Sequence, residues 1–155
     1  MGLGLLIGKD EEVASWVYES FNLYPMPVSL ALGVVEEHSE QLIGAIIFQE
    51  YNGNNVYLSY YGPNTLTVGV ARAIARISIR EFDASRVTIL TSKRNKRMMR
   101  KFERFGFKFE GSQRCFYGKK DCIRNTAARF VMFRDRIEEI AKLEHSDTMV
   151  DKRLH

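Results

Sequence analysis

One segment, residues 87–114, constrains the fold of this chain more than any other. A short apolar β-type run at residues 87–90 leads to Asn95, and a basic helical pattern follows. The inward positions of that helix are apolar: Met98, Phe102 and Phe105. Gly106-Phe107 then ends the helix, and a second β-type run reaches Gly111. A strand, a helix and a strand in this order indicate a sheet that is covered by helices.

The rest of the chain extends the same alternation of strands and helices. Asp10 is predicted to cap the first helix, and the Asn-Gly turn at residues 51–55 to close a hairpin, because such turns need positive φ. The predicted order is a strand (3–7), a helix from Asp10, three strands (29–36, 42–48 and 56–61), a helix (65–82), the segment above, a strand (128–133) and a helix (135–143). We therefore predict a single α/β domain over residues 1–145, with a central mixed sheet of six to seven strands flanked by helices on both faces. A polar tail is expected over residues 146–155.

The composition is that of one globular domain. The chain is 45% hydrophobic, with a formal charge of +4 and a pI of about 9.1, which permits an anionic partner without requiring one. Cys115 and Cys122 form no CxxC pair and the histidines are scattered, so no metal site is predicted. We expect reduced thiols, with one disulfide as the alternative. The short apolar run at the N-terminus is neither a signal peptide nor a membrane helix, which favours a cytoplasmic protein without membrane association.

Residues 87–114 resemble the second half of a GNAT-superfamily acetyltransferase. The matching features are Asn95, Gly106-Phe107, and Glu110-Gly111 followed by Arg114. Residues 66–71 are similar to the family's Q/R-x-x-G-x-G/A loop, with Gly69 and Ala71 at its small positions. The resemblance implies a GNAT-type fold that takes acetyl-CoA as co-substrate. The residues expected to hold it are Leu66, Thr67, Val68, Gly69, Val70, Ala71 and Asn95.

The resemblance also implies N-acetylation of an amine, carried by a small molecule or a protein. Phe102 stands where the family has the tyrosine that protonates the leaving thiolate, and a phenyl ring cannot donate a proton. Tyr61 and Tyr117 are the candidate substitutes, and Glu50 is the candidate base. In the alternative interpretation, Phe102 and Leu66 mark a catalytically degenerate GNAT-fold protein with a structural or binding role, for example virion-associated or in contact with nucleic acid.

Two basic patterns leave several interpretations open. The helix within residues 93–104 could offer a solvated face, bind CoA phosphates, or contact nucleic acid or an acidic protein. Its basic residues are Lys93, Arg94, Lys96, Arg97, Arg100, Lys101 and Arg104. Arg72, Arg76 and Arg80 recur every four residues and are expected to form a solvated face rather than a ligand site.

The N-terminal segment and the shortened glycine loop are similar to small GNAT proteins encoded by tailed bacteriophages. Such an origin would place the protein in the host cytoplasm or in a virion. The sequence is compatible with a homodimer or a larger assembly.

Overall fold

The computed structural model describes residues 2–23, 25, 27–62 and 66–143, so the predicted polar tail at 146–155 lies outside the described residues. The elements are β1 (Leu3–Leu6), α1 (Asp10–Phe21), β2 (Leu30–Glu36), β3 (Leu42–Gln49), β4 (Asn55–Tyr61), α2 (Val68–Arg80), β5 (Arg86–Ser92), α3 (Lys96–Phe105), β6 (Lys108–Gln113), β7 (Ala127–Phe133) and α4 (Arg134–Ala141). None of these helices combines the length and apolar character that crossing a bilayer requires.

The strands form one mixed sheet in the order β1-β2-β3-β4-β5-β7-β6. Neighbouring strands are antiparallel except β4 and β5, which are parallel and joined through α2. A parallel pair needs such a crossover because its second strand must start at the same end as its first. The predicted mixed α/β fold is confirmed.

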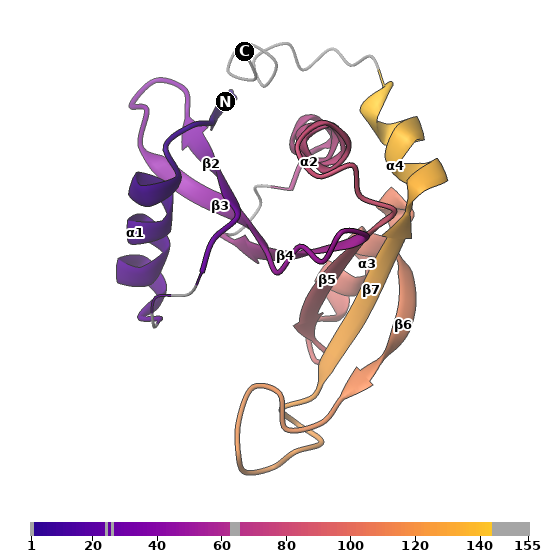
Figure 1. Ribbon diagram of the computed structural model, residues 1–155. Helices are drawn as coiled ribbons and strands as arrows, with labels where there is room; N and C mark the ends of the chain where they lie inside the picture. Colours follow the sequence, from indigo (N-terminus) through magenta and orange to yellow (C-terminus); the bar gives the residue numbers. More distant parts are fainter. Residues whose placement is uncertain (1, 24, 26, 63–65, 144–155) are drawn as a thin grey trace.

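Helices cover both faces of this sheet (Figure 1). On one face α1 packs against β2 and β3, through a cluster made of Val13, Val17, Ala31, Ala45 and Ile47. On the other face α2, α3 and α4 share a larger core, in which Ile46, Ile74, Phe102 and Ile140 are all at most 8% exposed. Side chains alternate along each strand, so each face receives its own apolar set.

The sequence predicts a solvated face for the arginine stripe of α2, and this prediction is wrong for Arg72. Arg72 is 2% exposed, and its Nη1 donates to the carbonyl of Leu143 at 3.0 Å. Arg76 Nε donates to the carbonyl of Ala141 at 3.0 Å, and Arg80 is exposed. The last carbonyls of a helix have no partner within it. The stripe therefore binds the C-terminal end of α4 to α2.

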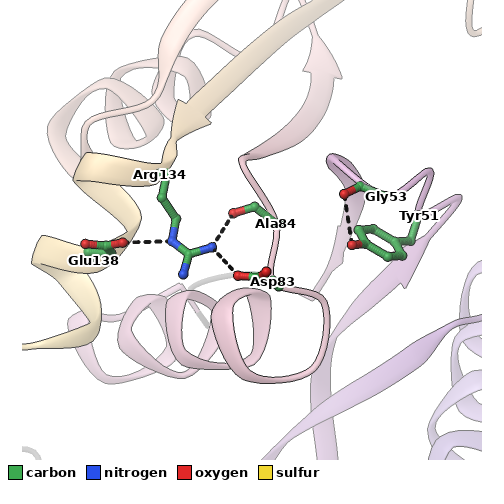
Figure 2. A network of polar contacts seen from close by, with 6 residues as sticks. All are labelled: Tyr51, Gly53, Asp83, Ala84, Arg134 and Glu138. Carbon is green, nitrogen blue, oxygen red and sulfur yellow. Dashed lines mark hydrogen bonds and ion pairs between the residues drawn. The ribbon is translucent and has the colours of Figure 1, made fainter.

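The start of α4 is fixed by a third arginine, Arg134 (Figure 2). Arg134 contacts Asp83 at 2.8 Å, the carbonyl of Ala84 at 3.1 Å and Glu138 at 2.9 Å. The hydrogen bond to Asp83, followed by that to Glu138, raises the pKa of Arg134. Both ends of α4 are thus bound to α2 or to the loop that follows it.

The turn between β3 and β4 is the predicted hairpin turn. The hydroxyl of Tyr51 donates to the carbonyl of Gly53 at 3.0 Å (Figure 2), and Gly53 has a φ of +97°. Asn52 Oδ1 accepts the N–H groups of Asn54 and Asn55 at 2.9 and 2.8 Å. These local bonds fix the register in which β3 and β4 pair.

Two local predictions need correction. The N-cap of α1 is Lys9, without a side-chain cap, and Asp10 is the first helical residue. Its carboxylate instead accepts the N–H of Ala31 at 3.1 Å and so attaches α1 to β2. Cys115 and Cys122 are joined by a disulfide, with Cα atoms 4.1 Å apart, rather than being reduced thiols. Folding back of the loop between β6 and β7 brings the two cysteines together.

Candidate functional site

The central feature of the candidate site is an opening between β4 and β5. Their parallel pairing ends at Leu58 and Ile89. Beyond these residues, the end of β4 (59–61) continues to pair with β3, whereas the end of β5 (90–92) pairs with β7. The two strand ends therefore diverge at their carboxyl termini, which is where ligands bind in open α/β sheets.

The N-terminus of α2 lies beside the β4 end of this opening. Leu66 donates its N–H to the hydroxyl of Tyr60 at 3.1 Å, which attaches the start of the helix to β4. Thr67 is the N-cap, and its Oγ1 accepts the N–H of Val70 at 3.2 Å. The first N–H groups of a helix have no partner within it and add partial positive charge. This turn, which includes the buried Gly69, is suited to an anion such as a phosphate.

The N-terminus of α3 lies beside the β5 end in the same way. Asn95 is its N-cap: Oδ1 accepts the N–H of Met98 at 3.1 Å, and its own N–H donates to the carbonyl of Ser92 at 2.8 Å. The N–H of Lys93 donates to the carbonyl of Thr126 at 2.9 Å, which attaches this turn to the β6–β7 loop. Two helix N-termini therefore flank one opening, and both favour negative charge there.

Comparison with solved structures identifies this architecture. A spermidine/spermine N-acetyltransferase SpeG from Vibrio cholerae matches with a TM-score of 0.69 at 12% identity, over 90% of this chain and 99% of that one. A GCN5-related N-acetyltransferase from Brucella melitensis matches with a TM-score of 0.59 at 19% identity, over 73% and 54%. A GNAT-family acetyltransferase from Bacillus anthracis gives 0.56 at 15%, over 78% and 72%. The chain has the GNAT fold.

This likeness is one of three-dimensional structure. No family model matches the sequence, and no curated protein matches it either. This chain therefore has the GNAT fold although its sequence shares few residues with those of its structural neighbours.

The two departures from the GNAT pattern both lie in the core. Leu66 is 4% exposed and belongs to the apolar cluster beneath α2, so at this position the loop offers its backbone rather than a polar side chain. Phe102 is 1% exposed, with ring centroids 5.6 Å from those of Phe107 and Phe130. Both side chains contribute to packing.

The structure brings two of the three catalytic candidates to the opening. Tyr61 is the last residue of β4, and its ring centroid is 5.2 Å from that of Phe21 on α1. Tyr117 lies half-exposed in the β6–β7 loop. Burial raises the pKa of both phenols, and Tyr61 is a further cause of the raised pKa of Tyr117. The phenol of Tyr61 therefore lies close enough to Tyr117 to affect its ionisation.

Glu50 lies elsewhere. It follows Gln49, the last residue of β3, which pairs with Tyr57. Tyr57 is four residues before Tyr61, or roughly 13 Å along the strand. The exposed Glu50 is thus at the closed end of the β4–β5 pair, and the structure does not bring it together with the tyrosines.

Two residues at the opening are not predicted by the sequence analysis. Arg129 on β7 lies opposite Leu90 of β5 and Gly111 of β6. Gln113 on β6 lies opposite Ala127 of β7. They become neighbours only because β7 inserts between β5 and β6, and no short-range pattern indicates that strand order. Across the described residues, no three histidine, cysteine, aspartate or glutamate side chains gather as a metal site would need.

Proposed function

We propose that the protein is an acetyl-CoA-dependent N-acetyltransferase that acts on an amine. The observation that carries this proposal is the divergence of β4 and β5 between two helix N-termini, in a chain with the GNAT fold. Known GNAT-fold neighbours are acetyltransferases, among them a spermidine/spermine N-acetyltransferase. The opening offers unpaired strand edges for an extended pantetheine arm and partial positive charge for its phosphates.

In this proposal the pyrophosphate binds at the first turn of α2. The backbone of residues 66–71 supplies the N–H donors, and Gly69 leaves room for close approach. Asn95 contributes its Nδ2, because its Oδ1 is engaged in capping α3. Exposed basic residues just before α3 and in its first turn supply further positive charge: Lys93, Arg94, Lys96 and Arg97.

The transfer itself needs an amine with a free lone pair and a proton for the departing thiolate. Attack of the amine on the thioester carbonyl forms the C–N bond, and the C–S bond then breaks to release CoA. Tyr61 or Tyr117 donates the proton, because phenols with raised pKa values remain protonated at neutral pH. The ammonium proton leaves through solvent, since Glu50 lies at the other end of the strands.

A second candidate function has its own support. The buried side chains of Leu66 and Phe102 fit a GNAT fold that has lost catalysis and serves as a structural or binding protein. On this alternative, acetyl-CoA would not bind or would not be turned over.

Isothermal titration with acetyl-CoA, followed by a CoA-release assay with amines, separates the two. We expect binding, and a loss of about a hundredfold in affinity for Gly69→Glu, because a carboxylate would face the phosphates. Gly69→Ala is the matched control, since it adds a methyl group without charge. Absence of binding by the folded wild-type protein at millimolar acetyl-CoA would refute the proposed acetyltransferase activity.

A further inference from the structure

Two polar side chains beside the opening carry buried atoms that lack a hydrogen-bond partner. They are Arg129, through its Nε, and Gln113, through its Oε1. Both residues are partly buried, and neither forms an ion pair or side-chain hydrogen bond with another described residue. Most buried polar groups in folded proteins are paired, and an unpaired one costs free energy. One donor and one acceptor on neighbouring strands beside the opening therefore suggest a ligand that supplies both partners.

Both side chains project from the sheet face that carries Tyr61. Tyr57 of β4 lies opposite Thr88 of β5, so the two side chains share one face of the sheet. Every second residue along a strand points to the same face, which places Tyr61 of β4 and Leu90 of β5 on that face as well. Arg129 is opposite Leu90 and therefore lies on the same face. Gln113 lies on this face too, because it is two pairs beyond Gly111, the residue of β6 that is opposite Arg129. The residues around the opening thus form one surface rather than two.

The strands around the two side chains carry small residues. The residues between and beside them are small: Gly111, Ala127 and Ser92. A side chain placed at Gly111 would meet nothing within 4 Å. Arg129 is one strand from the free end of β5, or about 5 Å, so its guanidinium can reach a molecule bound in the opening.

The charge of this surface selects the chemistry of the ligand. A guanidinium that no carboxylate of the described residues neutralises is suited to a carboxylate ligand, which its two Nη groups can bind through two parallel hydrogen bonds. The neighbouring carboxylate on β6, Glu110, is engaged with Arg86 and does not neutralise Arg129. A polyamine would meet repulsion from Arg129.

We propose that Arg129 binds a carboxylate of the acceptor, so that the acceptor is an amine that also carries a carboxylate. Gln113 accepts an N–H from the same molecule. This inference rests on the proposed function, because the opening is where the amine meets the thioester.

A matched pair of product analogues tests the assignment by binding alone. The CoA-loaded protein is titrated with N-acetylglycine and with N-methylacetamide, which share the acetamide group and differ in the carboxylate. We expect N-acetylglycine to bind about ten- to a hundredfold more tightly, and Arg129→Ala to abolish that difference. Arg129→Lys should restore part of it, because lysine keeps the charge without the planar fork. Equal binding of the two analogues, or a preference that survives Arg129→Ala, would overturn the assignment.

Lys108→Ala provides the control. Lys108 lies on the same face of β6, opposite Val131 and away from the opening, and its removal should leave the preference unchanged. Loss of the preference in this variant would mean that general surface charge, rather than Arg129, selects the carboxylate.

Turnover gives a second readout. With γ-aminobutyrate and putrescine, two amines of similar length, Arg129→Ala should raise KM for γ-aminobutyrate about tenfold or more with little change in kcat. Arg129→Glu should reverse the preference in favour of putrescine. Preference for putrescine by the wild-type protein would refute the proposal that the acceptor carries a carboxylate.

The two proposals fail in different ways. If CoA itself does not bind, the acetyltransferase fails and the acceptor assignment fails with it. If CoA binds and the two acetamides bind alike, only the carboxylate assignment fails.

Discussion

At the scale of single residues, Tyr61 and Tyr117 are the groups to which the proposed reaction assigns the proton chemistry that Phe102 cannot supply. Each phenol is held in its neutral form by burial, and Tyr61 adds an electrostatic cause to the raised pKa of Tyr117. The neutral form is the one that protonates a thiolate, so these environments agree with an acid role. They also make the two phenols weaker acids, which limits how fast either one can give up its proton.

Tyr61→Phe should lower the pKa of Tyr117 towards the ordinary tyrosine value of about 10, because one cause of its increase is removed. Ultraviolet titration of tyrosinate absorbance, with the Tyr117→Phe variant to assign the signal, measures the shift. An unchanged pKa of Tyr117 would show that the two phenols do not interact.

The same shifts determine how stability depends on pH. A phenol whose folded-state pKa is raised keeps its proton longer in the folded state than in the unfolded state. The stabilising contribution of Tyr61 is therefore complete below about pH 10 and is lost as pH rises through the folded-state pKa. In Tyr61→Phe the loss of stability above that pH should be shallower, as urea unfolding at several pH values would measure. An equally steep loss in the variant would contradict this sign.

Leu66→Gln restores the residue type of the GNAT pattern and should nevertheless fail to improve acetyl-CoA binding. Leu66 is 4% exposed in the core, so the new amide would be buried without a partner. We expect a loss of about 2–4 kcal/mol in unfolding free energy, measured by urea denaturation. Leu66→Met, which keeps the volume and the apolar character, should cost less than about 1.5 kcal/mol. Tighter acetyl-CoA binding by Leu66→Gln would mean that the loop can turn this side chain outward.

At the scale of elements, Gly106 controls how α3 ends. It has a φ of +99°, and its N–H donates to the last turn of α3. A Cβ at this position would lie 2.5 Å from Nε of Arg136, which itself donates to the carbonyl of Phe105 at 3.0 Å. Gly106 therefore adopts the left-handed conformation that ends α3, and its lack of a side chain leaves room for Arg136 of α4.

Gly106→Ala should destabilise the protein by about 2–3 kcal/mol, from backbone strain together with displacement of Arg136. Gly53→Ala is the matched control, because Gly53 has a φ of +97° but nothing within 4 Å of an added Cβ. It should cost only the backbone term of about 1 kcal/mol. Equal losses in the two variants, measured by thermal or urea unfolding, would show that the contact with Arg136 contributes nothing.

The junction of α2 and α4 depends on the buried Arg72 and the partly buried Arg76. Arg72→Ala should lower the unfolding free energy by about 2–4 kcal/mol, since it removes a buried, charged donor to the carbonyl of Leu143 and the packing of a long side chain. Arg80→Ala, at the exposed position of the same stripe, should change stability by less than about 0.5 kcal/mol. Equal effects of the two substitutions would restore the solvated-face interpretation.

These elements show what local sequence can and cannot determine. The hairpin at residues 51–55 and the cap at Gly106 were predicted, because each depends on a backbone conformation that only a few residue types adopt. The burial of Arg72 was not, because its partner is a carbonyl 71 positions away. The role of Asp10 is likewise not visible in the local sequence, which predicts a helix cap. Its actual partner, the N–H of Ala31, is 21 positions away.

At the scale of the whole molecule, the candidate site is a product of strand order. The helix N-termini that flank the opening follow β4 and β5 directly, so their sequence signals, Gly69 and Asn95, lie close to the strands that position them. Arg129 and Gln113 reach the opening only through the order β5-β7-β6. Glu50 was assigned to the site because it ends a strand, but antiparallel pairing places it at the opposite end.

The sheet consists of two halves that meet in a short parallel pairing, from Asn55 with Arg86 to Leu58 with Ile89. Beyond it the free strand edges of β4 and β5 face the opening, where an extended ligand would bridge the halves. Hydrogen exchange should therefore slow at residues 59–62 and 66–71 when acetyl-CoA is added, by up to about a hundredfold at a ligand concentration of 100 Kd where exchange requires release of the ligand. The antiparallel pair of β1 and β2, which lies at the edge of the sheet, should change little. Gly69→Glu should lose the protection at the same residues. Protection spread evenly over the sheet would place the ligand elsewhere, because only binding in the opening restricts these two segments selectively.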